Sequence, residues 1–256
     1  MNKITCITRS MNPKLYQKML ELSDPDWNFI RVLNSSAYDY IDYIFSNDFN
    51  SKWVLNLDED CFLTDYKKIY SLIEFLENNN FDYCGVQDGG SIPVRIHNPL
   101  VSNPFFNLFN VEKINKLEKK YRSTNKYNLD ELKKKYEKHI RFTHSALKYD
   151  LYEPFYKQFF WLLEEGLIPY FNNATPFDQE KYFVIAPIGR IVPYYNSPTL
   201  IFDNNEDELA IHTWHSRYYH YPNIKKAINN CYDYAKSKNK TLSNSKRNFV
   251  EVDLSK

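Results

Sequence analysis

The beginning of the chain alternates between apolar segments and helical segments, and this order constrains the fold more than any other feature. The apolar segments have the length and composition of buried strands, and each segment between them carries apolar residues on one helical face. Three strands joined by two helices predict a parallel sheet with right-handed crossovers, whose strands end at one common edge. We expect strands at 3–8, at 27–33 and from Trp53 onward, helices at 13–22, 37–45 and 66–77, and a further strand at 83–87.

The strand that begins at Trp53 ends in three acidic residues, Asp58, Glu59 and Asp60. Carboxylates this close to a buried strand repel each other and lose hydration at a cost, which a divalent cation removes. Mg²⁺ and Mn²⁺ bind carboxylate oxygens and keep other positions for water and phosphate. The pattern therefore predicts a metal site for a phosphorylated ligand. The alternative is a plain turn, in which Asp58 or Asp60 caps a helix that begins near Thr64.

Composition limits the class of protein. The 256 residues suffice for one large α/β domain or for a domain with an appendage. Lys and Arg total 33 against 32 Asp and Glu, so the net charge of +1 gives no general basis for nucleic-acid binding. The four cysteines lack the spacing of a zinc site or a disulfide framework, and we expect them reduced and buried. The N-terminus lacks the apolar core of a secretion signal and no segment has the length of a membrane span, so we expect a cytoplasmic protein.

A carboxylate opens a predicted helix in the second half of the chain. Glu153 precedes Pro154 and an apolar helix predicted at 155–163, which Gly166 ends. The helix dipole favours a carboxylate at this position, and this effect alone can explain the residue.

A late segment, predicted as a strand at 209–217, holds three side chains suited to ligand binding: His212, His215 and Arg217. Imidazole completes carboxylate metal sites, and guanidinium pairs with phosphate. A lone histidine is more often a hydrogen-bonded core residue, so that interpretation stays open for each of the two.

Residues 111–139 contain ten Lys or Arg and five acidic residues. We expect two helices here, separated by an Asn-rich break at 124–128, and a solvated insertion, because mixed-charge helical faces usually contact water. The alternative is peripheral contact with an anionic membrane surface, to which each cation contributes about 1 kcal/mol.

Taken in order along most of the chain, the Asp-x-Asp pair at a strand end, the glutamate that opens a helix and the late histidine resemble the GT-A glycosyltransferases. The strings LNLDEDCF and AIHTWHSRYY are most similar to bacterial and viral enzymes that build surface glycans. The resemblance implies an α/β fold of the GT-A (Rossmann-like) type, with a mostly parallel central sheet flanked by helices and a helical insertion at 111–139. It implies one domain over 1–256, with a nucleotide-binding half at 1–90, an acceptor and catalytic half at 91–220 and a helical tail at 221–256.

The implied activity is metal-dependent glycosyl transfer. The donor would be a nucleotide-diphosphate sugar held with Mn²⁺ or Mg²⁺, and the acceptor a glycan or a lipid-linked molecule, in the synthesis of surface polysaccharide or glycoprotein glycans. Asp58, Asp60 and His212 match the metal-binding positions of the family, with Asp58 also in reach of the donor ribose and His215 as a substitute for His212. Thr8 and Arg9 match positions that begin to hold the nucleotide base and the diphosphate.

The resemblance also suggests catalytic residues. Glu153 matches the acid that deprotonates the acceptor hydroxyl in inverting members, although Pro154 departs from the usual following residue. Asp178 and Glu164 are the alternative bases, and Arg217 would add positive charge near the leaving group. Amide side chains suit hydroxyl-rich ligands because they donate and accept at once, so the loop at Gly89 and Gly90 and residues 95–109 are candidates for sugar contacts. The polar side chains meant are His97, Asn98, Asn103 and Asn107. The alternative is that Asn98-Pro99 and Asn103-Pro104 form ordinary turns.

Two other classes use the same features. A metal-dependent phosphoesterase or nucleotide-sugar hydrolase could employ the same two carboxylates and histidine, and rapid donor hydrolysis without an acceptor would indicate it. A non-catalytic carbohydrate-binding protein could have the same fold, and an absence of Mn²⁺-dependent nucleotide binding would indicate that class instead.

Overall fold

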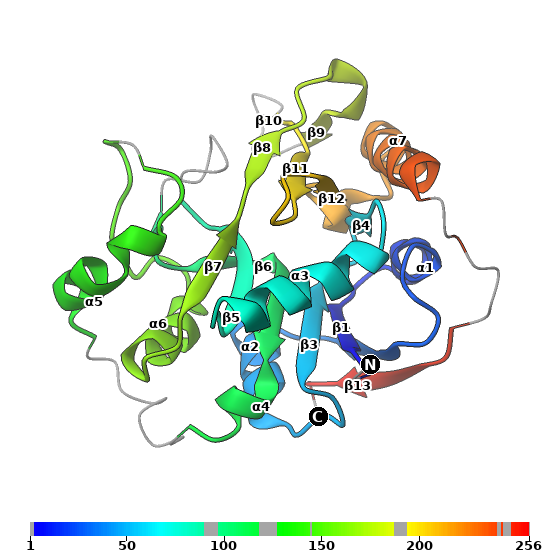
Figure 1. The fold of residues 1–256 in the computed structure, drawn as a ribbon. Helices are drawn as coiled ribbons and strands as arrows, with labels where there is room; N and C mark the ends of the chain where they lie inside the picture. Colours follow the sequence, from blue (N-terminus) through cyan, green and yellow to red (C-terminus); the bar gives the residue numbers. More distant parts are fainter. Residues whose placement is uncertain are drawn as a thin grey trace.

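A seven-stranded sheet forms the centre of the molecule, in the strand order β13-β2-β1-β3-β6-β5-β7 (Figure 1). The computed structural model describes residues 3–89, 97–117, 127–143, 145–186, 194–239, 242 and 247–255. The strands of this sheet are β1 (Thr5–Arg9), β2 (Asn28–Leu33), β3 (Trp53–Leu57), β5 (Tyr83–Gln87), β6 (Ser102–Asn110), β7 (Pro169–Asn172) and β13 (Phe249–Asp253). Strand β6 runs antiparallel to β3 and β5, and the other neighbours are parallel. The sheet is therefore mainly parallel, as predicted for an α/β fold.

Helices cover both faces of this sheet. They are α1 (Pro13–Glu21), α2 (Ala37–Ser46), α3 (Lys67–Asn78) and α6 (Tyr156–Glu164). Successive residues of a strand point to opposite faces, so Cys6 packs with α1 and α3 while the next residue, Ile7, packs with α2 and α6. Leu55 and Val54 divide between the two faces in the same way. The alternation of strand and helix that the sequence predicted thus produces a sheet with a core on each side.

Local sequence signals set the ends of these helices. Asn12 caps α1 by accepting hydrogen bonds from the amides of Lys14 and Leu15, and Ser36 caps α2 by accepting one from the amide of Asp39. Helix α6 ends in a Schellman turn, in which Leu167 N donates to Leu162 O at 3.0 Å. Gly166 adopts a φ of 87° in this turn, a left-handed conformation that glycine reaches without strain.

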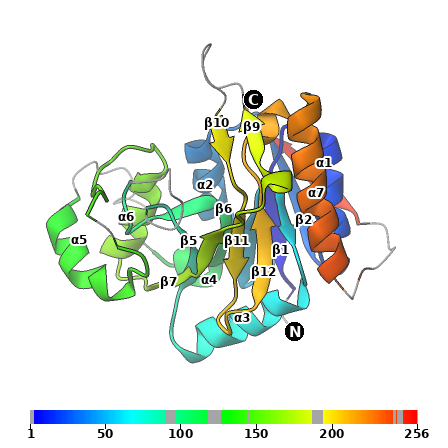
Figure 2. The ribbon, with the colours of Figure 1, turned by 90° about the horizontal axis from the view of Figure 1, so that it is seen from above.

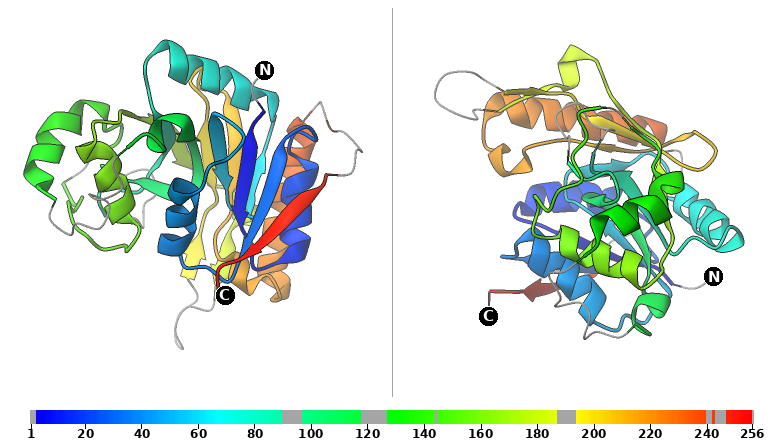
Figure 3. Two further views of the ribbon diagram at one scale, coloured as in Figure 1. Left: turned by 90° about the horizontal axis from the view of Figure 1, so that it is seen from below. Right: turned by 90° about the vertical axis from the view of Figure 1, so that its left-hand side faces the viewer.

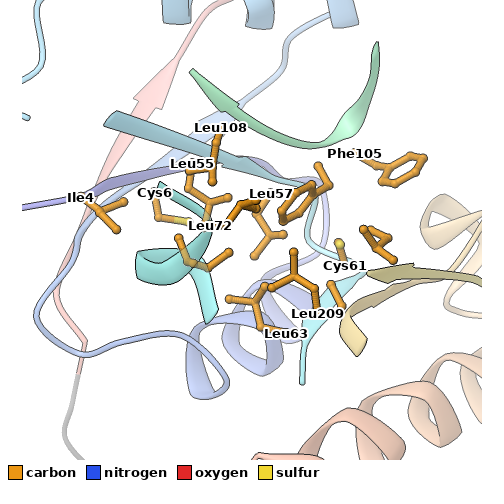
Figure 4. Packing of buried hydrophobic residues seen from close by; sticks show 14 of the residues in the cluster. Ile4, Cys6, Leu55, Leu57, Cys61, Leu63, Leu72, Phe105, Leu108 and Leu209 are labelled. Carbon is orange, nitrogen blue, oxygen red and sulfur yellow. The ribbon is translucent and has the colours of Figure 1, made fainter. Parts of the chain in front are cut away.

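A second, four-stranded antiparallel sheet packs against the first, in the order β4-β12-β11-β8. Its strands are β4 (Cys61–Leu63), β8 (Ala174–Pro176), β11 (Thr199–Phe202) and β12 (Glu208–His212). Seen from above, β11 and β12 lie over the central strands (Figure 2). Leu63 and Leu209 of this sheet join the same buried cluster as Leu55 and Leu57 of the central sheet (Figure 4). The other face of the small sheet packs on α7 (Pro222–Lys238), through Ile211 and Ile228 among others.

The other described elements are short. They are α4 (Val111–Ile114), α5 (Leu129–Tyr136), η2 (Glu137–His139), η3 (Glu180–Tyr182), a hairpin of β9 (Val184–Ala186) and β10 (Tyr194–Asn196), and η4 (Ser216–Tyr218). No helix among the described residues is both long and apolar enough to cross a membrane.

The predicted helical insertion at 111–139 contains α4, α5 and η2, and its residues 118–126 lie outside the described part of the chain. Helix α5 is not solvated on all sides, because Leu132 and Tyr136 are buried and the Tyr136 hydroxyl donates to Leu163 O at 2.7 Å. Its basic residues Lys133–Lys135 are exposed. One apolar face of α5 therefore packs on α6. The prediction of a solvated insertion, which was based on mixed charge, did not include this contact.

Two further expectations about secondary structure were wrong. The strand predicted at 209–217 ends at His212, and the polar residues that follow leave the sheet. Among its described residues, the tail at 221–256 is helical only in α7, since β13 then pairs in parallel with β2 and forms an edge of the central sheet (Figure 3).

Candidate active site

The acidic residues after β3 form a tight turn. Cys61 N donates to Asp58 O at 3.0 Å, which closes a four-residue turn, and β4 starts at Cys61. Helix α3 begins later, at Lys67, whose amide donates to Asp65 Oδ1. The alternative in which Asp58 or Asp60 caps this helix is therefore wrong.

His212 reaches the acidic turn through the pairing of β4 with β12. His212 lies opposite Cys61 in this antiparallel ladder, and Thr213 N donates to Asp60 O at 3.0 Å. His212 Nε2 consequently lies 3.5 Å from Asp60 Oδ1. One ligand atom from each of Asp58, Asp60 and His212 lies within 4.8 Å of the other two. Residues far apart in the sequence thus converge at one point.

This group of atoms fits a divalent cation. Oxygen ligands lie about 2.0–2.6 Å from Mg²⁺ or Ca²⁺, so two ligands of one ion are at most about 4–5 Å apart. Asp58 Oδ1 and His212 Nδ1 are buried and make no hydrogen bond to any described residue. Buried polar atoms normally have a partner, and a cation or a ligand would supply one here. Two carboxylates and one imidazole match the donor types that Mn²⁺ and Mg²⁺ accept.

Aromatic side chains fix the imidazole. The Phe105 ring stacks on His212, with ring centroids 4.0 Å apart and an interplanar angle of 7°. Trp214 packs edge-on against the same imidazole at 4.6 Å and 74°. This arrangement has no local signal in the sequence, because Phe105 belongs to β6 and approaches His212 only through the folding of the sheet.

Burial changes the protonation of the acidic turn. Loss of hydration raises the pKa of Asp58 from 3.8 to about 6, with the nearby charge of Asp60 adding to the effect. Arg9, whose guanidinium lies 3.9 Å from Asp58 Oδ2, lowers the pKa but does not outweigh burial. The ionised turn is therefore costly by itself, and a bound cation would remove that cost.

The middle residue of the turn points elsewhere. Glu59 accepts hydrogen bonds from Ser10 Oγ at 2.7 Å and from Asn12 N at 2.8 Å. Arg31 Nε donates to the same Ser10 hydroxyl, and Arg31 is paired with Glu251 of β13 at 2.7 Å. Glu59 thus anchors the turn to the loop after β1, while the residues on either side of it face the ligand space. Burial raises the pKa of Glu59 to about 7.

A cavity of about 290 Å³ opens beside the acidic turn, at the carboxyl ends of β1 and β3. Ligands commonly bind at this edge in α/β sheets, and the volume is at the lower end for ligand pockets. Eight of the predicted site residues line it: Arg9, Asp58, Asp60, Asn103, Glu153, His212, His215 and Arg217. Burial, and next the charge of Arg217, lower the pKa of His215, so this imidazole is neutral at pH 7.

Other predicted site residues lie outside this cavity. Thr8 is buried within β1, and its exposed fraction of 0% leaves no surface for a ligand. Asp178, between β8 and η3, and Glu164, the last residue of α6, are exposed and are not among the described lining residues. The structure therefore brings Glu153, and neither alternative base, to the acidic turn.

Most of the predicted sugar contacts have structural roles. Asn107 is buried in β6, donates to Ser102 Oγ and accepts from Asn56 Nδ2. Asn98 is buried and donates to Asp150 O. Asn103 also donates a buried hydrogen bond, to Asp88 Oδ1 at 2.6 Å, but unlike the other two it lines the cavity.

Gly89 approaches another part of the backbone rather than a ligand. A Cβ atom at Gly89 would lie 2.1 Å from the carbonyl oxygen of His97, so only glycine leaves room for that segment. Gly90 and Arg95, the remaining residues of that prediction, lie outside the described residues.

All four cysteines are free and buried, as expected from their spacing. A larger hollow of about 720 Å³ lies at the opposite ends of β1 and β2, next to Trp27 and Phe249. Among the described residues, the cluster of possible metal ligands occurs only at the smaller cavity, which we therefore take as the candidate site.

The fold and the site define a mixed α/β protein with a mainly parallel, helix-flanked central sheet and a histidine and two carboxylates at its edge. No family model matches the chain, and no curated protein matches it. Among solved structures, the chain is similar to the mannosyltransferase PcManGT from Pyrobaculum calidifontis, determined in complex with GDP-Man and Mn²⁺. The sequence identity is 7% and the TM-score 0.35, and the likeness covers 60% of this chain and 58% of that chain.

Proposed function

We propose that the protein is a metal-dependent glycosyltransferase, which moves a sugar from a nucleotide-diphosphate donor to a glycan or lipid-linked acceptor. The observation that carries the proposal is the convergence of Asp58, Asp60 and His212 in a cavity that also holds two arginines and a further carboxylate. A site built for a metal alone would not need the arginines, which suit phosphate oxygens. A synthetic role in surface polysaccharide or glycoprotein glycans is part of the proposal.

The ligand set supports a divalent metal and a phosphorylated donor. Asp58, Asp60 and His212 would hold Mn²⁺ or Mg²⁺, which would offset the negative charge that develops on the departing diphosphate. Arg9 and Arg217 would pair with phosphate oxygens and hold the donor in one orientation. The half of the chain at 1–90 would then hold the nucleotide, and the half at 91–220 the acceptor.

Glu153 is the proposed general base. Its carboxylate would take the proton of the acceptor hydroxyl while the acceptor oxygen bonds to the anomeric carbon of the sugar. The bond from that carbon to the diphosphate oxygen breaks, and the diphosphate leaves with the electron pair. General-base catalysis of this kind contributes about 10²–10⁴-fold in rate.

Thermal unfolding with a panel of nucleotides and nucleotide sugars, with and without Mn²⁺, tests the donor site. A ligand that binds the folded state raises its stability, so we expect one nucleotide class to raise the melting temperature only when Mn²⁺ is present. Asp60→Ala should abolish that increase. If no nucleotide stabilises the wild type, the proposal fails in favour of a non-catalytic protein.

A second measurement separates transfer from hydrolysis. The stabilising nucleotide sugar is incubated with Mn²⁺ and the wild-type protein, without an acceptor, and release of the nucleotide is followed. A transferase should release it slowly, since its base is placed for an acceptor hydroxyl. Rapid multiple turnover would refute transfer and establish a nucleotide-sugar hydrolase.

A further inference from the structure

An exposed aromatic side chain lies beside the candidate site. Tyr152 is 64% exposed, which is unusual for so large a side chain, and Tyr152 directly precedes Glu153, which lines the cavity. Because consecutive Cα atoms are about 3.8 Å apart, the backbone of Tyr152 lies next to that of a residue that lines the cavity, although Tyr152 itself is not a lining residue.

The exposed ring is nevertheless fixed in place. The Tyr152 ring stacks on the imidazole of His97, with centroids 3.9 Å apart and an interplanar angle of 6°. Asp150 holds both partners, because its carboxylate lies 3.3 Å from His97 Nδ1 and accepts from Tyr152 N at 3.3 Å. Asn98 Nδ2 donates to Asp150 O at 3.0 Å. The stacking thus orients the ring, and the other three contacts hold its backbone and its stacking partner.

Only one face of the ring is covered. His97 packs on that face, and its own backbone is seated on Gly89, where a Cβ atom would collide with the His97 carbonyl. The high exposure of Tyr152 therefore belongs to the opposite face of its ring. A flat apolar surface of fixed orientation is presented to water next to a carboxylate.

We infer that Tyr152 is a stacking platform for a pyranose ring of the acceptor, so that the acceptor is a glycan at its reacting end. The inference rests on the proposed glycosyl transfer and names its acceptor class. One face of a pyranose consists of C–H groups, which carry slight positive charge and pack on the negative face of an aromatic ring. The hydroxyl groups at the ring edge then remain free to reach Glu153.

The fixed orientation favours this role. A ring that is held before binding loses no rotamer freedom when the sugar arrives, so less of the stacking energy is spent on ordering. His97, predicted from the sequence as a sugar contact, acts in this arrangement as a positioning residue behind Tyr152. The sequence offered no signal for the pair, because the two residues are distant in the chain.

Saturation-transfer NMR with the methyl glycosides of glucose, galactose, mannose and N-acetylglucosamine tests the platform. We expect at least one of them to bind the wild type through the C–H groups of one face. Tyr152→Phe should keep that affinity, and Tyr152→Ala should lower it about tenfold, the size of effect that aromatic contacts provide. His97→Ala, which frees the ring, should give an intermediate loss while preserving the same contacted face of the sugar. The control is Phe249→Ala, since Phe249 is an exposed aromatic residue of the edge strand β13 and does not line the candidate cavity, and it should bind like the wild type.

Calorimetry of nucleotide binding with Mn²⁺, on the same variants, separates this inference from the proposed function. Nucleotide affinity should be equal in the wild type and in Tyr152→Ala, which also shows that the variant is folded. If nucleotide binds but no methyl glycoside does, or if Tyr152→Ala binds the sugar unchanged, the platform is refuted and glycosyl transfer stands. Absence of nucleotide binding in the wild type would remove both.

Discussion

Asp58→Asn should stabilise the metal-free protein and destabilise the metal-bound one. Burial raises the pKa of Asp58 from 3.8 to about 6, so the folded state favours the neutral acid. Each pKa unit corresponds to about 1.36 kcal/mol, and the difference corresponds to roughly 3 kcal/mol. Because the pKa is higher in the folded state, the protonated Asp58 contributes its full stabilisation below pH 3.8. This contribution to the free energy of unfolding is lost as the pH rises to about 6. Asparagine cannot ionise and avoids the loss.

Urea unfolding followed by tryptophan fluorescence measures this difference. In EDTA at pH 7.5, we expect the free energy of unfolding of Asp58→Asn to exceed that of the wild type by up to about 3 kcal/mol, and at pH 4 by close to zero. With saturating Mn²⁺ at pH 7.5 the order should reverse, because the wild type gains the binding free energy and the variant has lost a ligand.

Asp233→Asn is the matched control, since Asp233 is exposed on α7 and should show neither the pH-dependent gain nor the reversal. A less stable Asp58→Asn in EDTA at pH 7.5 would show that the carboxylate stabilises the fold by itself. A wild type that gains nothing from Mn²⁺ would show that the three side chains do not hold a cation. Either result refutes the reasoning.

Three further predictions concern single side chains. His212→Ala should weaken Mn²⁺-dependent nucleotide binding in calorimetry by about tenfold or more, and a larger loss in His215→Ala would move the ligand role to that residue. Glu153→Gln should keep donor affinity but reduce the transfer rate at least about 100-fold, and normal transfer would place the base elsewhere. Gly166→Ala should lower the free energy of unfolding by about 1 kcal/mol, since φ is 87° there and no atom lies close enough to clash; unchanged stability in urea would contradict a purely conformational cost.

The first half of the fold could be predicted because its signals are local. The helix at Ala37–Ser46 has an apolar face, and the strand at Trp53–Leu57 is a short apolar run, so each element is encoded within its own residues. Strand β4 has only three residues, and β13 contains two acidic residues. Neither segment has a hydrophobic pattern that distinguishes it from a loop in the sequence. Their existence depends on partners far along the chain, which a single sequence does not reveal.

The sequence indicates the site residues that stand close together in polar motifs, but not those whose role depends on contacts between distant strands. The closely spaced acids Asp58 and Asp60 and the histidine that ends β12 are unusual enough in sequence to indicate a ligand site. In the sequence, Asn107 cannot be distinguished from an asparagine that binds a sugar. In the structure its amide makes buried hydrogen bonds to Ser102 and Asn56. The stacking of Phe105 on the imidazole depends on the pairing of distant strands, so the sequence alone does not indicate it.

The ligand set also has a mechanical consequence. Asp58 and Asp60 lie on the turn that leaves the central sheet, whereas His212 is the last residue of a strand in the small sheet. A cation held by all three would clamp one sheet to the other, so that amides of β4 and β12 should exchange with deuterium more slowly once Mn²⁺ is added. In the metal-free protein we expect local unfolding to begin at this junction between the two sheets, before the parallel strands of the central sheet open.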